Sequence, residues 1–227
     1  MLERINLFGS STIGIYACVT DSYCLVPGTL KPNILERFEN TFKVPCIPLN
    51  VTFKRLIGIM MVGNSRGLLL PNHINPNDEV TIREAMGQVP GVKIHVLEES
   101  KLNALGNLIA PNDNGALISS KFQSNSSIKV IEEVLGGKVK KASINNSPLV
   151  GTKIVVNSSG CLVTPLATDE EAESLHEIYN VENVDFSTVC MGIESIRIGI
   201  LANSEGAFVG ESTSGPEMAR ISEVLEV

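Results

Sequence analysis

The stretch VGNSRGLLLP at residues 62–71 joins an apolar start, a polar turn containing Asn64 and Gly67, and an apolar strand. The same layout recurs in VTDSYCLVP (19–27), APNDNGALIS (110–119), VNSSGCLVTP (156–165) and ANSEGAFVG (202–210). The turn glycines Gly67, Gly115, Gly160 and Gly206 are spaced by 48, 45 and 46 residues, and Tyr23 stands 44 residues before Gly67. Such regular spacing is typical of a repeat protein.

A second set of regularly spaced residues supports this alignment of the repeats. Gly14, Gly58, Gly106 and Gly151 each stand nine residues before the turn position, and Arg197 takes this place in the last repeat. Two independent marks at matching spacings predict five repeats, which together form a single ring domain over residues 1–227.

Each repeat predicts a hairpin, a helix and a further strand. The hairpin is expected because Asn and Gly tolerate the positive φ of tight turns. Pro, Asp, Ser or Thr near the helix starts suit helix N-termini. The expected helices cover residues 32–42, 76–87, 126–136, 168–179 and 215–227, and strands such as 92–99 and 181–189 follow most of them.

The two ends of the chain together supply the strands of the last repeat. No strand follows the last helix, whereas residues 3–9 form a spare strand. We expect this strand to pair beside Ala207, Phe208 and Val209, because an open array would leave unpaired edges and exposed apolar faces. The expected fold class is α/β, a five-repeat pseudo-symmetric α/β propeller closed by the N-terminal strand. A WD-type propeller is excluded, since its blades lack helices and carry Trp-Asp marks, and this chain has no Trp.

Composition limits the function classes. The 18 basic and 25 acidic residues give a formal charge of −7, and no basic stripe is visible, which argues against a protein that coats nucleic acid. An acidic protein is better suited to a basic protein surface. No stretch reaches the roughly 20 apolar residues that span a bilayer. Five scattered cysteines without a C-x-x-C pair suit buried thiols in a reducing compartment. We expect a cytoplasmic monomer that makes no membrane contact.

Few residues suggest catalysis. Gly63–Gly67 match G-x-S-x-G, but a strand follows where a nucleophile elbow needs a helix. His73, His95 and His176 have no second ligand at metal-binding spacing, so neither a metal nor a cofactor is expected. The alternative function is catalysis by Cys190. Five-repeat ring enzymes that modify guanidino groups, the deiminases and amidinotransferases, carry a nucleophilic Cys late in the chain, together with a His and two carboxylates, and no matching His loop is visible here.

The repeats resemble a known family. Gly63-Asn64 with Gly67-Leu68-Leu69, the string Ala104-Leu105-Gly106-Asn107, Leu149-Val150-Gly151, and Asn157 with Gly160 are similar to translation initiation factor 6, as are Ile13-Gly14 and Tyr23–Val26. The resemblance covers the whole chain. It implies the fold called a pentein and a non-catalytic factor that binds the large ribosomal subunit and blocks joining of the small one. The resemblance leaves a further role in large-subunit maturation open.

The resemblance also implies which partner the protein contacts and which of its residues make that contact. The main partner would be a ribosomal protein on the intersubunit face, with no extensive nucleic-acid contact. The contact face would lie at the strand ends around the repeat glycines, where Asn107 is placed at a strand start. Arg197 departs from the repeat pattern in the fifth unit. The expected partner-binding residues are Gly14, Gly58, Gly106, Asn107, Gly151 and Ser195.

Overall fold

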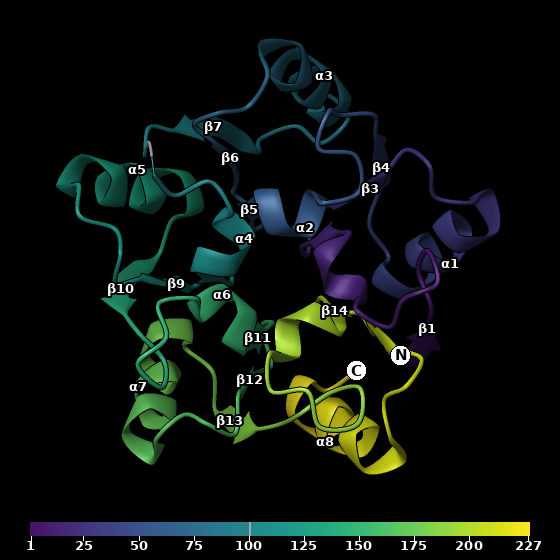
Figure 1. Ribbon diagram of the computed structural model, residues 1–227, viewed down its shortest axis with the longest axis vertical. Coiled ribbons are helices and arrows are strands. Elements are labelled where there is room, and N and C mark those ends of the chain that lie inside the picture. Colours follow the sequence, from purple (N-terminus) through teal and green to yellow (C-terminus); the bar gives the residue numbers. More distant parts are fainter. Residues whose placement is uncertain (100) are drawn as a thin grey trace.

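Five three-stranded sheets stand around a central axis in the computed structural model, which describes residues 1–99 and 101–227 (Figure 1). Each sheet belongs to one repeat unit, numbered 1 to 5 in chain order. The first strand of each unit lines the central channel and pairs antiparallel with the second. The five-repeat ring expected from the sequence is confirmed, as five separate sheets and not one continuous barrel.

The strands fall into three sets. The first strands are β2 (Cys18–Val19), β5 (Val62–Gly63), β8 (Ile109–Pro111), β11 (Ile154–Val156) and β14 (Ile200–Ala202). The second strands are β3 (Cys24–Pro27), β6 (Gly67–Pro71), β9 (Gly115–Ser119), β12 (Gly160–Val163) and β15 (Ala207–Gly210). The third strands, parallel to the second, are β4 (Cys46–Leu49), β7 (Lys93–Leu97), β10 (Lys138–Ala142), β13 (Asn183–Phe186) and β1 (Leu2–Ile5).

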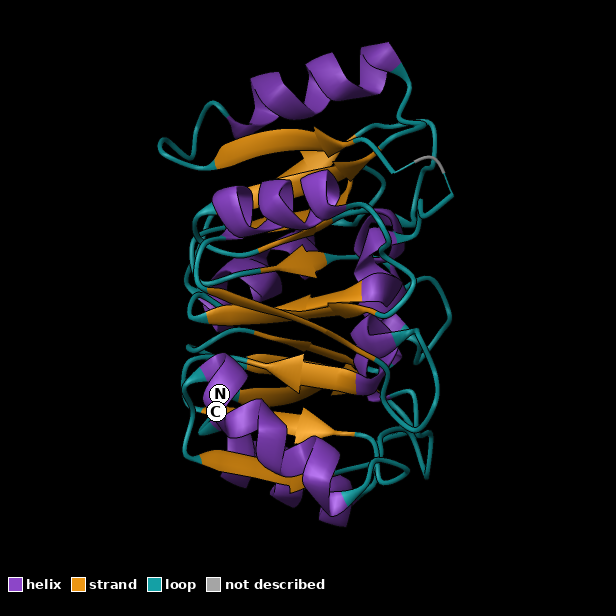
Figure 2. Ribbon diagram, turned by 90° about the vertical axis from the view of Figure 1, so that its left-hand side faces the viewer, coloured by secondary structure: helices purple, strands orange, loops and turns teal. Residues whose placement is uncertain are grey.

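One long helix follows the second strand of each unit and covers the outside of the ring (Figures 1 and 2). In units 1 to 4 this helix leads to the third strand, whereas in unit 5 the third strand is the N-terminal β1. These helices are α1 (Pro32–Phe42), α3 (Pro76–Met86), α5 (Asn125–Leu135), α7 (Asp169–Tyr179) and α8 (Gly215–Leu225), within two residues of the expected bounds. Side chains of Asn75, Ser124, Thr168 and Ser214 cap the last four, as the sequence predicts for helix starts. Lys31 precedes α1 and provides no such cap.

Five short helical segments form an inner ring that the sequence did not predict. They are η1 (Ile13–Ile15), α2 (Ile57–Met60), α4 (Leu105–Leu108), α6 (Val150–Lys153) and η2 (Ile196–Ile198). They gather around the axis on one side of the molecule, whereas the chain termini lie on the other side (Figures 1 and 2). We call these sides the helix face and the turn face.

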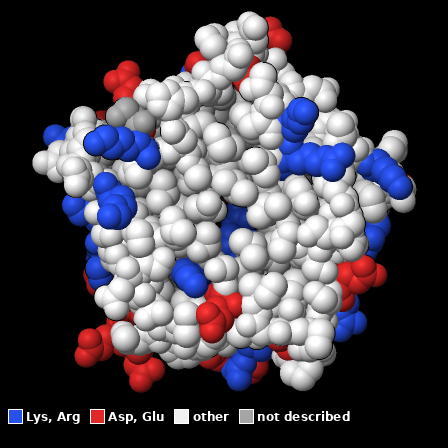
Figure 3. Space-filling view, viewed as in Figure 1, with Lys and Arg blue, Asp and Glu red and all other residues white. Residues whose placement is uncertain are grey.

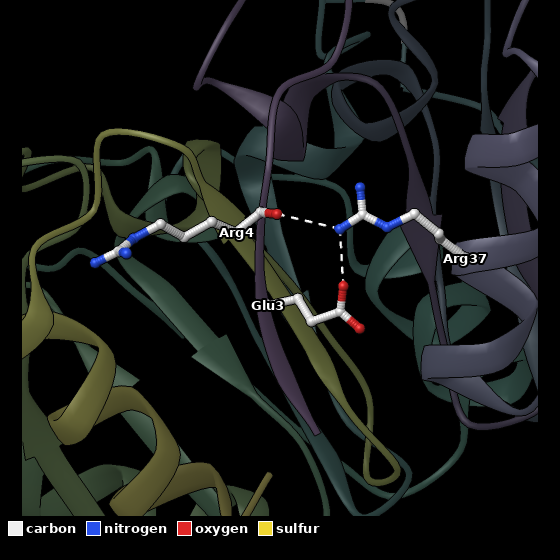
Figure 4. A network of polar contacts seen from close by, with 3 residues as sticks. All are labelled: Glu3, Arg4 and Arg37. Carbon is white, nitrogen blue, oxygen red and sulfur yellow. Dashed lines mark hydrogen bonds and ion pairs between the residues drawn. The ribbon is translucent and has the colours of Figure 1, made fainter.

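The N-terminal strand closes the ring. β1 lies parallel to β15, with Leu2 opposite Ala207 and Ile5 opposite Gly210. The prediction of pairing beside Ala207–Val209 is therefore confirmed, although the strand ends at Ile5 because Leu7 and Ser10 form a tight turn. Figure 4 shows Arg37 of α1 reaching β1, where it donates to the Glu3 carboxylate at 2.8 Å and to the Arg4 carbonyl at 3.2 Å.

The hydrophobic core lies between the units. Each of its five clusters combines residues of two neighbouring units; Leu25 and Ile47 of unit 1, for example, share a cluster with Ile57 and Leu68 of unit 2. A single unit thus exposes apolar surface on both flanks, and the closed ring buries the residues of all five clusters.

Four buried asparagines tie the turn face together. The Asn112 Oδ1 accepts from the backbone of Asn114 and Gly115, both at 2.9 Å, and thus closes its own turn. Its amide group donates to the carbonyls of Asn157 (3.1 Å) and Tyr179 (3.0 Å) in the next unit. Asn64, Asn157 and Asn203 repeat this pattern.

The turn glycines have a different role from the one expected. Gly67, Gly115, Gly160 and Gly206 do not adopt positive φ. A Cβ atom at Gly115 would instead overlap the Ile178 carbonyl oxygen at the end of α7, and one at Gly160 would overlap the Val224 carbonyl oxygen of α8. The repeated glycine is therefore required by the close approach of the next unit's helix. Asparagine side chains, not positive φ, close the turns.

Candidate partner-binding face

The repeat glycines bring the short helices into contact. A Cβ atom at Gly58 would overlap the carbonyl oxygens of Gly14 and Ala17, one at Gly106 would overlap that of Gly58, and one at Gly151 would overlap that of Gly106. Each short helix thus packs directly on the preceding one. The glycines give the centre of the helix face its shape.

Arg197 interrupts this series in unit 5. A Cβ atom at Gly14 would overlap the Arg197 carbonyl oxygen, so the backbone contact between units 5 and 1 is kept. The Arg197 guanidinium donates to the Gly14 carbonyl at 3.1 Å and lines the channel. Burial lowers its pKa, against the opposing effect of the nearby Cys18 thiol. The sequence correctly marked this position as a departure from the repeat, and the structure shows a basic group at the channel.

The predicted site residues lie on this face but differ in exposure. Gly14, Gly58, Gly106 and Gly151 are buried, whereas Asn107 and Ser195 are partly exposed. Asn107 lies in α4 and not at a strand start, which corrects that expectation. Within residues 1–99 and 101–227, its side-chain amide makes no hydrogen bond. A partner on this face would touch the residues around the glycines and not the glycines themselves.

Two apolar residues of this face escaped the sequence analysis. Leu56 and Leu149 are 41% and 43% exposed and directly precede α2 and α6, two positions before the repeat glycines. Ser195 holds the same place before η2. The sequence could have indicated Leu56 and Leu149 through their repeated position two residues before the repeat glycines. Most of the helix face is uncharged, and its charged side chains lie mainly toward the rim (Figure 3).

Carboxylates from the long helices hold the loops that border this face. Asp78 of α3 accepts from the Thr52 backbone and hydroxyl (2.9 and 2.5 Å), and Glu171 of α7 accepts from the Asn145 backbone. Glu217 of α8 accepts from the backbone of Met191 (3.1 Å) and Gly192 (2.9 Å).

Glu217 is the most strongly bound of these carboxylates. Partial burial raises the pKa of its carboxyl, but hydrogen bonds from Ser214, Gly192 and Thr188 outweigh burial and lower the pKa to about 2. The loop it holds contains the exposed Met191, at φ +65°. An ionised carboxylate therefore fixes a loop with unusual backbone geometry at the edge of the face.

The channel offers little room for a ligand. Its cavity of about 50 Å³ lies among residues such as Cys18, Gly151 and Arg197, which is space for a few water molecules at most. Burial raises the pKa of the Cys18 thiol to about 11, with a smaller opposing effect from Arg197. In the described part of the chain no three His, Cys, Asp or Glu side chains are grouped to hold a metal ion.

Cys190 lies away from the channel. Its Sγ contacts the Ser11 carbonyl at 3.5 Å and the Thr213 hydroxyl at 3.7 Å, and its side chain is 7% exposed. The histidines are in the places expected from the sequence, His73 in a turn, His95 in β7 and His176 in α7. His176 Nδ1 lies 3.0 Å from the Val181 carbonyl. The G-x-S-x-G serine, Ser65, lies in the hairpin turn between β5 and β6.

One basic strip was missed. Strand β10 carries Lys138, Lys140 and Lys141, all exposed, at the open edge of its sheet. Lys138 forms an ion pair with Glu177. Lysines on an edge strand discourage pairing with a second chain.

None of the helices among the described residues is long and apolar enough to cross a membrane.

Comparisons with known proteins agree with the repeat marks. The family model described as the eIF-6 family matches residues 2–224. Translation initiation factor 6 of Methanococcus vannielii is 36% identical, with 100% of this chain and 99% of that protein covered. The protein of the same name from Pyrococcus horikoshii is also 36% identical, over 99% of this chain and 98% of its own length. Among solved structures, the N-terminal domain of ArgZ, a cyanobacterial arginine dihydrolase, matches 89% of this chain and 73% of its own, at 12% identity and a TM-score of 0.49. By the full-length match of model and relatives, the chain belongs to the eIF-6 family.

Proposed function

We propose that this protein is a translation initiation factor that binds the large ribosomal subunit and prevents its association with the small one, with large-subunit maturation as a second proposed role. The observation that carries the proposal is full-length membership of the eIF-6 family, whose relatives are named translation initiation factor 6. The main partner would be a ribosomal protein, and the factor would act as a cytoplasmic monomer without a catalytic step.

The helix face is the proposed contact surface. It is broad and mostly uncharged, and it presents Leu56 and Leu149 beside a ring of tightly packed short helices. A rigid face loses little conformational entropy when it binds, which favours steric exclusion. The formal charge of −7 suits a protein partner better than a phosphate backbone.

Cosedimentation tests this proposal. The protein should pellet with isolated large subunits and not with small ones, and should lower the yield of joined ribosomes. We expect Asn107→Arg to weaken large-subunit binding about tenfold, a loss of about 1.4 kcal/mol, because it places a charge at the centre of the face. Asn40→Arg is the matched control, since Asn40 is exposed near the end of α1, toward the turn face.

Two results would contradict the proposal. One is sedimentation with small subunits instead of large ones. The other is an unchanged yield of joined ribosomes at saturating protein. Equal binding by the Asn107 and Asn40 variants would exclude the helix face as the contact surface while leaving large-subunit binding itself intact.

A further inference from the structure

A groove crosses unit 1 on the rim of the helix face. One cavity of about 850 Å³ lies among Gly28, Thr29, residues 49–56 and Asp78. A second, of about 440 Å³, lies among residues 6–9, 29–31, Asn33, Ile34 and Arg55. Both cavities share Thr29 and Arg55, so they form one continuous depression, which we call the Arg55 groove. Volumes of this size are typical of ligand sites.

The walls of the Arg55 groove are rich in apolar side chains. Leu49 and Val51 are buried along it, and Phe53, Leu30 and Ile34 are partly exposed. Leu49 ends strand β4, and the other residues come from the loops and the helix start that follow strands β3 and β4. Exposed apolar surface inside a depression marks a place where another molecule can bury its own apolar groups.

The rim of the groove is basic although the protein is acidic. Lys31, Lys54 and Arg55 line it and are all exposed. Its single lining carboxylate, Asp78, is buried and occupied by the Thr52 hydrogen bonds. Basic side chains gather over this part of the face, at the upper right of Figure 3, with no acidic side chain among them. The groove thus offers positive charge to an anionic partner.

Two aromatic residues line the groove, Phe8 and Phe53, and the ring of Phe8 is already in contact with other side chains. The Arg55 guanidinium carbon lies 4.0 Å from the centroid of the Phe8 ring, and Tyr16 packs edge-on against the same ring at 5.1 Å. Proteins that bind single-stranded nucleic acid use open aromatic faces on which bases stack. Arg55 covers one face of Phe8, and most of the apolar lining is aliphatic, namely Leu30, Ile34, Leu49 and Val51. Aliphatic walls suit aliphatic peptide side chains and not stacked bases, so the groove suits an acidic peptide better than RNA.

We propose that the Arg55 groove docks an extended acidic peptide segment that carries apolar side chains. In an extended segment, alternate side chains point to opposite sides, so apolar residues can enter the groove while carboxylates meet Lys31, Lys54 and Arg55. Ion pairs with the guanidinium and the ammonium groups would orient the peptide, and apolar burial would supply affinity. This surface lies beside the short helices and shares Leu56 with the large-subunit contact surface proposed above, whereas its basic residues lie outside that surface.

Fluorescence anisotropy tests the groove with a defined probe, a labelled twelve-residue peptide in which Asp alternates with Leu or Phe. Saturable binding is expected. The double variant Lys54→Glu/Arg55→Glu should bind at least tenfold more weakly. The double variant Lys121→Glu/Lys140→Glu changes the net charge equally on exposed residues of unit 3 and should bind like the unchanged protein. Amide NMR shifts on titration should be confined to residues 6–9, 28–34 and 50–56.

Further probes separate the possible outcomes. A peptide with Lys in place of Asp, or with Ser in place of Leu and Phe, should bind at least tenfold more weakly. The proposal is overturned if no probe saturates, if both double variants lose binding equally, or if a twelve-nucleotide uridine RNA binds the groove more tightly than the acidic peptide. Large-subunit cosedimentation of the Lys54/Arg55 variant, measured alongside, reports separately on the function proposed above.

Discussion

The buried asparagines show how single residues join the units. Each closes its own turn with Oδ1 and reaches two carbonyls of the next unit with its amide group. Unit 1 carries Thr20 at this place, which closes its turn but has no amide to donate. There the Tyr23 hydroxyl donates to the Gly67 carbonyl at 3.0 Å and supplies the link to unit 2. Tyr23 therefore stands in for a missing amide.

Replacement of Asn112 tests this role. Asn112→Ala removes four hydrogen bonds, including the side-chain donor to the Asn157 carbonyl, and leaves the Tyr179 carbonyl with the Asn114 amide as its side-chain donor, so we expect a loss of about 3 kcal/mol in the free energy of unfolding. Urea unfolding measures it. Asn40→Ala, at an exposed position of α1, should change stability by less than about 0.5 kcal/mol. Equal midpoints for the two variants would refute the role of the buried amide.

For single residues, the sequence predicted where the repeated glycines stand but not why glycine is required there. The regular spacing located Gly67, Gly115, Gly160 and Gly206 correctly. Their cause is a helix of the next unit that approaches each turn. It joins residues about 65 positions apart for Gly67, Gly115 and Gly160, and the two ends of the chain for Gly206, so it leaves no local mark in the sequence. Asn107 is predicted as a contact residue through the resemblance, whereas its place in α4 was not predicted.

At the scale of elements, α8 combines two tasks at its first turn. Ser214 and Glu217 form a capping box, which stabilises the helix start. The same Glu217 carboxylate holds the backbone of Met191 and Gly192, and its Oε1 accepts from the Thr188 hydroxyl at 2.7 Å. Helix start and loop therefore depend on one ionised group.

This dependence predicts a pH effect. Because folding lowers the pKa of Glu217 to about 2, its carboxylate stabilises the protein above the ordinary pKa near 4.5, and this stability is lost as the pH falls toward 2. We expect Glu217→Gln to cost about 2 kcal/mol at pH 7. The difference from the unchanged protein should shrink between pH 4.5 and 2 in urea unfolding. Glu223→Gln, at an exposed position of α8, serves as control; a pH-independent difference for Glu217→Gln would contradict the linkage.

Long elements were predictable and short ones were not. The five long helices follow from caps and apolar periodicity within about eleven residues, and the strands follow from apolar runs beside polar turns. The short helices have three or four residues and no side-chain caps. They depend on glycine contacts between units, so the surface formed by Leu56, Asn107 and Leu149 required the structure.

For the whole molecule, closure is the decisive property, because the core lies between units and not within them. Unit 5 meets unit 1 through β1, whose Glu3 and Arg4 hold Arg37 of α1, and through the stacked rings of Phe38 and Phe208, 5.0 Å apart. The first and last residues of the chain therefore belong to one unit. This explains why the sequence showed a strand missing at one end and spare at the other.

Closure by β1 predicts opposite effects for two changes. Deleting residues 1–9 removes the buried Ile5 and Leu7 together with the β15 pairing, so we expect a loss of at least about 4 kcal/mol in unfolding free energy. A circular permutant that begins at Ser10 and joins Val227 to Met1 through a flexible Gly-Ser linker keeps the same strand in place. The termini lie close together in Figures 1 and 2, so this permutant should retain stability to within about 1 kcal/mol. Urea unfolding compares both with the unchanged protein.

If the deletion variant fails to fold, the permutant still tests closure. In the permutant β1 is attached to the other end of the chain but keeps its position in the ring, so unchanged stability shows that this position is what the protein requires. A deletion variant with an unchanged midpoint, or a permutant as unstable as the deletion, would contradict closure by β1.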